Sequence, residues 1–408
     1  MSIQILPEDV AAQIAAGEVI ERPMSVVKEL LDNAIDAGAD DIRVEIRDGG
    51  VRLIRVSDNG CGIPAAEAEI AFQRHATSKL RTAADLERIA TLGFRGEALF
   101  SIAAVSQLTL LTRTIHEEMG TRLRLEGGTL VQREGHGTPL GTSVAVENLF
   151  YNVPARRKFL RSEGTESAHI TALITRYALA WPDLRFRLKR NERLAFQSSG
   201  SGEMIDVILK VYDLETTRRL IDFHHEENGI LVWGYASLPA LTRADRGHQS
   251  IFVNRRWVQD RVLTRALLDA YHGLLPSGRF PVAILHVEMD PSEIDVNVHP
   301  TKAEIRFRRS RDVFTAVQKA VRQALSQADP VRAMETPPRA ISGPDYRQGA
   351  TDWPHRPSAQ WGRLALDLQH TGDSLDPSLS GSDMILHAGP AGQTDLEMKH
   401  ENGSVPRN

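Results

Sequence analysis

Cysteine is almost absent from this chain, since its 408 residues include a single one, Cys61. A single cysteine excludes an intramolecular disulfide and a cysteine-rich zinc site, and it fits a reducing compartment. We interpret Cys61 as a small buried filler rather than a nucleophile. Long apolar runs are also missing: no stretch approaches about 18 uninterrupted apolar residues, so no membrane-spanning helix is expected. The early acidic residues do not fit a secretory signal, and we therefore expect a cytoplasmic protein without a membrane partner.

Neither sign of charge dominates. The formal net charge is -4 and the isoelectric point is near 6.4, so global charge does not predict binding to nucleic acid or membranes. Any DNA contact would need a local basic patch. The content of 41% hydrophobic and 25% charged residues is typical of a soluble globular protein, and the length is sufficient for two domains and a tail.

The hydrophobic periodicity predicts helices mixed with antiparallel strands, and hence an α+β fold with helices over one face of a mixed sheet. The "GG" turn between two alternating segments is a hairpin signal, and Pro23 suits a first helical turn. In the first part of the chain we expect helices at 8–20, 24–37, 65–74, 84–92 and 167–182, a hairpin at 41–60, and further strands within 106–150 and 185–199.

A second unit is expected after the first, with strands at 229–237, 249–258 and 281–289 and helices at 261–275 and 311–327. The order of strand, helix and strand around 250–290 predicts a crossover connection. From about Pro330 onward proline, glycine, serine and aspartate accumulate and periodicity disappears, which is typical of a linker or disordered tail. We therefore expect domains at 1–215 and 216–330, followed by a tail at 331–408.

The segment "KELLDNAIDAG", residues 28–38, carries three polar side chains in one row. At about 100° per residue, Glu29, Asn33 and Asp36 fall within roughly 60° of arc, opposite an apolar face around Leu30 and Leu31. The row is either a solvated helix face or one wall of a site.

Glycine-rich loops give this row something to face. In "SDNGCGIP", residues 57–64, Asp58 ends a predicted strand, although such segments are often simple turns. A second motif is "RHATSKL", residues 74–80. The third, "LGFRGEALFSIAAV", residues 92–105, suits phosphate binding at a helix start, or is only a glycine-bounded helix start. The chain has no Walker A loop.

Six motifs in order carry a resemblance: "GEVIERPMSVVKELLDNAIDAGA", "DNGCGI", "RHATSKL", "GFRGEAL", "GTSVAVENLFYNVPARRKFL" and "NVHPTKAEIRF". Over roughly residues 1–325 the chain resembles the MutL family of DNA mismatch repair proteins, within the GHKL ATPase superfamily. The resemblance implies a GHKL-type two-layer α/β sandwich, a mixed sheet with helices on one face, followed by a smaller split βαβ domain.

The resemblance also implies site roles. Glu29 would orient and activate the attacking water, Asn33 would hold Mg²⁺ through its carbonyl oxygen, and Asp58 would accept a hydrogen bond from the adenine amino group. Lys302 would reach the γ-phosphate from the second domain, or it is an exposed loop lysine. Asp36 is assigned a structural role, such as ordering the loop after its helix. The implied nucleotide-binding set, with ATP and Mg²⁺ as cofactors, is Asn33, Asp58, Gly60, Gly62, Thr77, Ser78, Lys79, Gly93, Phe94, Arg95, Gly96, Glu97, Ala98, Leu99 and Thr142; the catalytic pair is Glu29 and Lys302.

A local basic cluster lies in the second unit. Arg255, Arg256, Arg261 and Arg265 could contact DNA phosphates without sequence preference, in a salt-dependent way. The alternative is that they are scattered solvated arginines.

By resemblance the function is ATP-driven coupling of mismatch recognition by a MutS-type protein to downstream nuclease or helicase factors, at the nucleoid. Weak ATP hydrolysis would act as a switch for dimerisation of the N-terminal domains. The alternatives are the ATPase subunit of a type II topoisomerase and a non-catalytic DNA-binding scaffold. Full family members carry a C-terminal dimerisation domain, whereas this chain ends in linker-like sequence and lacks a D-x-H-A-x-x-E motif. Endonuclease activity and constitutive dimerisation are therefore not expected of it.

Overall fold

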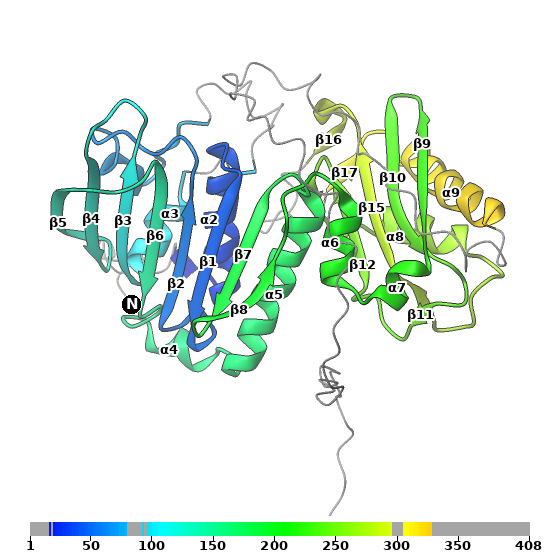
Figure 1. The fold of residues 1–408 in the computed structure, drawn as a ribbon, viewed down its shortest axis with the longest axis horizontal. Coiled ribbons are helices and arrows are strands. Elements are labelled where there is room, and N and C mark those ends of the chain that lie inside the picture. Colours follow the sequence, from blue (N-terminus) through cyan, green and yellow to red (C-terminus); the bar gives the residue numbers. More distant parts are fainter. Residues whose placement is uncertain (1–15, 18, 80–91, 94–95, 296–304, 329–408) are drawn as a thin grey trace, which may run out of the picture. The chain divides into compact units, whose positions relative to one another are not determined.

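The computed structural model describes residues 16–17, 19–79, 92–93, 96–295 and 305–328. These residues form two larger β-sheets and two short two-stranded ones, with helices packed against the larger sheets (Figure 1). Within these ranges no helix combines the length and the apolar character that crossing a membrane requires. The expected helix at 84–92 and most of that at 8–20 lie outside the described residues.

The first sheet has eight strands in the order β5-β4-β3-β6-β2-β1-β7-β8. Its pairs are antiparallel except for β1 and β7, which run parallel, so the sheet is mixed as expected. Alternation explains the strands: in β1 the buried residues are Ile42, Val44 and Ile46, and they all lie on one face. The strands are β1 (Asp41–Arg47), β2 (Leu53–Asp58), β3 (Gln107–Arg113), β4 (Gly120–Glu126), β5 (Thr129–His136), β6 (Gly141–Glu147), β7 (Arg185–Arg190) and β8 (Arg193–Gln197).

Helices cover one face of this sheet (Figure 1). The helix α2 (Pro23–Asp36) begins with a proline in its first turn, as predicted, and buries an apolar side that includes Val27, Leu30 and Leu31. Beside it lies α5 (Glu163–Ala180), which the Ser162 hydroxyl caps at its N-terminus. The polar side of α2 is consequently left for other segments of the chain. The other described helices before Leu220 in the chain are α3 (Ala98–Ala104), α4 (Pro154–Lys158), α6 (Met204–Val211) and α7 (Leu214–Arg218).

The second larger sheet has five strands in the order β13-β12-β15-β10-β9. Here β12 and β15 pair in parallel, and α8 lies between them in the chain, so the predicted crossover is confirmed. The boundaries at 215 and 330 stay predictions. The elements are β9 (Leu220–Glu227), β10 (Ile230–Ser237), β11 (Thr242–Arg243), β12 (Gln249–Val253), β13 (Arg256–Trp257), α8 (Arg261–Ala270), β14 (Phe280–Pro281), β15 (Ala283–Glu288), β16 (Ile294–Asp295), β17 (Arg306–Phe307) and α9 (Ser310–Gln327).

The expected helix at 65–74 is wrong, because the segment forms turns with only a short 3₁₀ helix, Ile70–Phe72. Its apolar residues are too few to anchor a helix: Ala68 and Phe72 are buried, whereas Ile70 is exposed. Side chains from elsewhere in the sequence also form hydrogen bonds with backbone groups at the start of this segment. The Glu117 carboxylate accepts from the Ala65 N–H at 2.8 Å, and an arginine of β5 donates to the Ala65 carbonyl.

Candidate functional site

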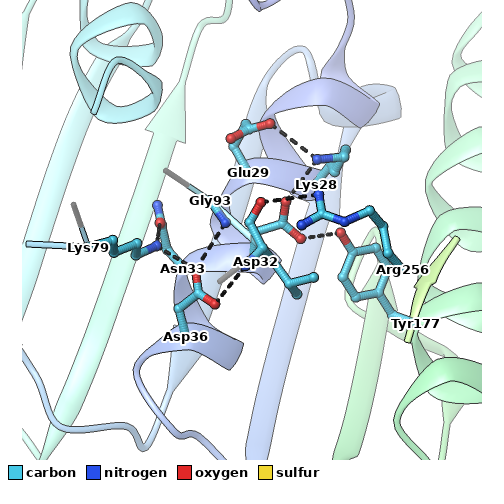
Figure 2. A network of polar contacts seen from close by, with 10 residues as sticks. Lys28, Glu29, Asp32, Asn33, Asp36, Lys79, Gly93, Tyr177 and Arg256 are labelled. Carbon is cyan, nitrogen blue, oxygen red and sulfur yellow. Dashed lines mark hydrogen bonds and ion pairs between the residues drawn. The ribbon is translucent and has the colours of Figure 1, made fainter. Parts of the chain in front are cut away.

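The polar row of α2 faces segments that are distant in the sequence (Figure 2). The ammonium of Lys79 lies 2.9 Å from the Asn33 Oδ1 and 2.6 Å from the Asp36 Oδ2. The Asp36 carboxylate also accepts the backbone N–H groups of Leu92, at 3.0 Å, and of Gly93, at 3.1 Å. Asn33 and Asp36 therefore bind segments that are distant in the sequence, so this part of the row is not a solvated face.

Asp36 thus joins α2 to Lys79 and to the segment at residues 92–93, rather than to the loop directly after its helix. Lys79 was expected at the phosphates and here binds the amide oxygen that was expected to hold Mg²⁺. The Asn33 oxygen thus accepts a hydrogen bond from an ammonium group.

Glu29 lies one turn before Asn33 and contacts its sequence neighbour. The Lys28 ammonium is 3.3 Å from the Glu29 Oε1 and 2.8 Å from the Asp32 Oδ2, and the Tyr177 hydroxyl donates to the Asp32 Oδ1 (Figure 2). Sequence reasoning missed Lys28, Asp32 and Tyr177. The available signal was an aspartate next to the apolar residues of an amphipathic helix, because a buried carboxylate requires a partner.

Asp58 ends β2 at a partly buried position. Its Oδ1 accepts the backbone N–H groups of Gly60, at 2.9 Å, and of Thr142, at 3.2 Å. Among the residues that the structure describes, no donor is recorded for its second oxygen. Burial raises the pKa of Asp58 to about 6, while the two backbone hydrogen bonds act in the opposite direction. The second oxygen is the one free to accept from a ligand.

The segment around Asp58 is fixed by close backbone approach. A Cβ on Gly62, which has φ +73°, would lie 2.2 Å from the Arg113 carbonyl oxygen, so only glycine fits there. A Cβ on Gly60 would lie 2.8 Å from Ala37, and the Cys61 N–H donates to the Ala37 carbonyl at 3.0 Å. Asp58 is thus held at the C-terminal end of α2, with Glu29 about 12 Å away along the helix axis.

Cys61 is exposed and not a buried filler, so that expectation is wrong. It follows Gly60 and precedes Gly62 in the turn after β2, where its N–H is bound to Ala37 and its side chain is left outside the core. Its thiol makes only a 3.5 Å contact with the Gly62 carbonyl among the described partners.

The segment at residues 74–79 contacts the segment that begins at Gly96. Gly96, with φ +64°, lies where a Cβ would be 2.7 Å from the Ala76 carbonyl oxygen. The Glu97 carboxylate is 3.4 Å from the His75 Nδ1 and 3.9 Å from Arg74. The Thr77 hydroxyl accepts the Lys79 N–H at 3.1 Å. Ala98 and Leu99 begin α3, and Ser78 is exposed between Thr77 and Lys79. Phe94, Arg95 and Lys302 lie outside the described residues.

The Thr142 side chain supports the same turn. Its hydroxyl is 3.1 Å from that of Thr112, which also accepts the Ile63 N–H at 2.7 Å. Since the Thr142 N–H already binds Asp58, the start of β6 and the Asp58 turn form one hydrogen-bonded unit. Thr142 therefore acts on the site through this turn.

The four arginines of the predicted basic cluster separate into two kinds. Arg255 has a side chain only 12% exposed, stacks over the Trp181 ring at 4.5 Å and contacts the Asp183 carboxylate at 3.2 Å. Arg256 donates to the Leu92 carbonyl at 3.4 Å. Arg261 and Arg265 lie on α8, and the Arg265 side chain is 73% exposed and paired with Asp269. Arg255 and Arg256 thus contact residues that are distant in the sequence, whereas the exposed Arg265 pairs with a neighbour on its own helix.

Two family models match successive parts of the chain. The model of histidine kinase-, DNA gyrase B- and HSP90-like ATPases matches residues 18–149. The model of the C-terminal domain of DNA mismatch repair proteins matches residues 208–326. The first range contains the whole polar row of α2 and Asp58, and the second contains the five-stranded sheet.

Curated and solved relatives agree with these matches. The DNA mismatch repair protein MutL of Desulforamulus reducens is 47% identical over 325 residues, which are 80% of this chain and 51% of that protein. The corresponding protein of Symbiobacterium thermophilum is 49% identical over 326 residues, with the same shares. The chain thus spans about half the length of the curated relatives it matches.

Among solved structures, the N-terminal domain of a DNA repair protein aligns with a TM-score of 0.67 and 28% identity, over 78% of this chain and 98% of that one. The Aquifex aeolicus MutL ATPase domain complexed with ADP aligns with a TM-score of 0.55 and 28% identity, over 76% and 100%. The fold is therefore the GHKL-type sandwich that the six motifs predicted. The chain belongs to the MutL family of DNA mismatch repair proteins, and it carries the ATPase-type region of that family.

Proposed function

We propose that this chain binds ATP with Mg²⁺, hydrolyses it slowly, and uses the bound nucleotide as a switch in DNA mismatch repair. The observation that carries the proposal is the alignment along α2. Asp58 lies at its C-terminal end, Asn33 and Asp36 contact Lys79 and Gly93, and Glu29 lies one turn further on. A nucleotide has the same order of parts, from base to γ-phosphate. The ADP in the Aquifex aeolicus MutL structure supports a nucleotide as the ligand class.

At the base end, the second oxygen of Asp58 would accept from the adenine amino group, while its first oxygen stays on Gly60 and Thr142. This acceptor is fixed before binding, so little ordering is needed. Gly62 keeps the turn close enough for the backbone to lie against the base.

At the phosphate end, Asn33 would hold Mg²⁺ together with phosphate oxygens and water. The described residues contain no group of three or more His, Cys, Asp or Glu suited to a metal, so the ion would depend on the nucleotide for most of its shell. Mg²⁺ offsets the charge that develops on the phosphates. Lys79 would leave the Asn33 oxygen and contact a phosphate, and Lys302 would add a positive charge at the γ-phosphate.

Glu29 would accept the proton of the attacking water. Its Oε1 contacts Lys28, whereas no partner is recorded for its Oε2 among the described residues. One oxygen is thus held and the other is available to a water at the phosphate end.

The switch would work through the segments that Asp36 and Lys79 hold. Bound phosphates would replace the Lys79 contacts, order the lid formed by residues 74–80 and 92–99, and allow two ATPase regions to associate. We place the dimer downstream of a MutS-type protein and upstream of nuclease or helicase factors, at the nucleoid. The matches to MutL proteins favour this function over that of a topoisomerase subunit.

Association in the presence of a non-hydrolysable ATP analogue tests the switch. Sedimentation velocity of the 408-residue chain should show monomers without nucleotide and a concentration-dependent dimer with the analogue and Mg²⁺. A chain that binds the analogue and stays monomeric over the same concentrations would contradict the switch.

We propose further that DNA binds at α8 through Arg261 and Arg265. Replacing both by glutamine should weaken retention of duplex DNA and lower the slope of log affinity against log salt by about 2, since each phosphate contact contributes about one unit. Arg122 and Arg124 on β4, changed together to glutamine, remove the same charge elsewhere. An equal loss in both double variants would show that net charge alone attracts DNA, and would exclude α8 as the contact.

A further inference from the structure

The contacts next to Glu29 form a chain of three side chains that ends on another helix. The Lys28 ammonium lies 3.3 Å from the Glu29 Oε1 and 2.8 Å from the Asp32 Oδ2, and the Tyr177 hydroxyl of α5 donates to the Asp32 Oδ1 (Figure 2). A lysine side chain has many rotamers, and an exposed pair on a helix fixes them weakly. Here the lysine also contacts Asp32, which is buried, so we expect its side chain to be held more firmly than in an exposed pair.

Asp32 is only 2% exposed, so its carboxylate is costly unless it is paired and hydrogen-bonded. Lys28 and Tyr177 bind its two oxygens from opposite sides. Burial raises the pKa of Tyr177 well above its usual value, and the Asp32 carboxylate raises it further, so the hydroxyl remains a donor. Burial would lower the pKa of Lys28, but Asp32 and Glu29 outweigh it and raise that pKa, so the ammonium stays charged.

Because Asp32 holds the Lys28 ammonium in place, the ammonium can in turn fix the position of the Glu29 carboxylate. One carboxylate oxygen is kept at the ammonium, and the rotation that aims the other oxygen is restricted. An uncertainty of about 1 Å in the position of a catalytic group can cost about 100-fold in rate, so such a restraint has a measurable effect on turnover without touching the nucleotide.

We propose that Lys28 is a positioning residue for Glu29, and that Asp32 on the same helix, itself bound by Tyr177 of α5, holds it in place. The inference rests on the proposed function, because it assigns a role within that hydrolysis. Arg256 lies beside Tyr177 in Figure 2 and donates to the Leu92 carbonyl. The edge strand β13, the backbone at Leu92 and the support of Glu29 therefore lie close together.

Kinetics of the 408-residue chain test the inference, with kcat, KM and the melting temperature measured for each variant. Tyr177→Phe keeps the ring and removes the hydroxyl donated to Asp32, and we expect kcat to fall about 10-fold with KM unchanged. Lys28→Met should lower kcat by about 100-fold, and Lys28→Arg should restore most of it. In a Glu29→Ala background, Tyr177→Phe should cause no further loss.

Two matched controls separate positioning from loss of stability. Tyr271→Phe removes a buried hydroxyl that donates to the Ser237 carbonyl, and Arg219→Met removes a helical ion pair with Glu215; both should leave kcat unchanged. If Lys28→Met does not fold because the buried Asp32 carboxylate loses its ion pair with Lys28, Tyr177→Phe and Lys28→Arg decide the question.

A kcat in Tyr177→Phe equal to that of Tyr271→Phe, or a parallel fall of kcat and nucleotide affinity, would overturn the positioning role. This failure differs from failure of the proposed function. The function fails if Glu29→Ala keeps its turnover, whereas an inactive Glu29→Ala beside a fully active Tyr177→Phe removes only the present inference.

Discussion

Glu29→Ala is expected to retain nucleotide binding and to lose hydrolysis. The side chain lies on the outer face of α2, contacts only Lys28 among its described partners, and supports no backbone group, so its removal leaves the nucleotide contacts of Asn33 and Asp58 intact. General-base catalysis contributes about 10²- to 10⁴-fold, and we expect kcat to fall by at least about 100-fold while the Kd for ATP changes less than about threefold.

Phosphate release under saturating ATP checks this, with Glu67→Ala as an exposed control. A variant that hydrolyses ATP at the wild-type rate would remove Glu29 from the reaction. A non-catalytic scaffold would show no hydrolysis in the wild type either, so the same assay separates the ATPase from that alternative.

Asp58→Asn is expected to weaken nucleotide binding while it stabilises the fold at neutral pH. The amide can keep Gly60 and Thr142 on its oxygen, but it presents a donor where adenine also donates. A lost hydrogen bond to a charged acceptor corresponds to about 1.5–3 kcal/mol, or roughly 10- to 150-fold in Kd.

The stability change follows from the raised pKa of Asp58, about 6 against an ordinary 3.8. The folded state binds this proton more tightly than the unfolded state, so the carboxyl favours folding below about pH 4. This contribution is lost as the pH rises through 4 to 6, and the buried charge is a constant cost above that. Asparagine has no charge to bury, so the variant should be more stable by on the order of 2 kcal/mol at pH 7.5 and by much less at pH 4.

Thermal unfolding of Asp58→Asn at pH 7.5 and at pH 4 checks the change in stability, and a titration with ATP checks the loss of nucleotide affinity. Asp48→Asn is the matched control, because Asp48 is exposed and its backbone, with φ +50°, suits asparagine equally well. Equal stabilisation at both pH values would show that the cost at Asp58 is not electrostatic. An unchanged ATP affinity would remove Asp58 from the base site.

Local pattern explains which parts of the fold could be predicted. The helix α2, the β1–β2 hairpin and the β12–α8–β15 crossover each carry their own periodicity and turn residues, so they follow from short stretches of sequence. The segment 65–74 has a helical composition, but its backbone contacts to Glu117 and Arg133 decide its structure. Glu117 lies in the loop between β3 and β4, and Arg133 lies on β5. Long-range partners of this kind leave no local signal.

In the candidate site, too, the local pattern could be predicted from the sequence and the distant partners could not. The row of Glu29, Asn33 and Asp36 was visible in the spacing, and the six motifs gave it a ligand class. The partners were not visible: Tyr177 is 145 residues from Asp32, and Arg255 stacks on Trp181 rather than pointing to solvent. Charge clusters in a sequence indicate where arginines are, whereas the structure is needed to find which of them already have partners.

Single-turnover phosphate release by the wild type and by Glu29→Ala, at equal nucleotide occupancy, tests the central claim most directly. Occupancy is first matched by titrating each protein with ATP and Mg²⁺, so that binding does not enter the comparison. The account predicts one phosphate released per bound ATP in the wild type, and at least about 100-fold slower release in the variant. Equal rates in the two proteins, or no ATP bound by the wild type, would contradict it.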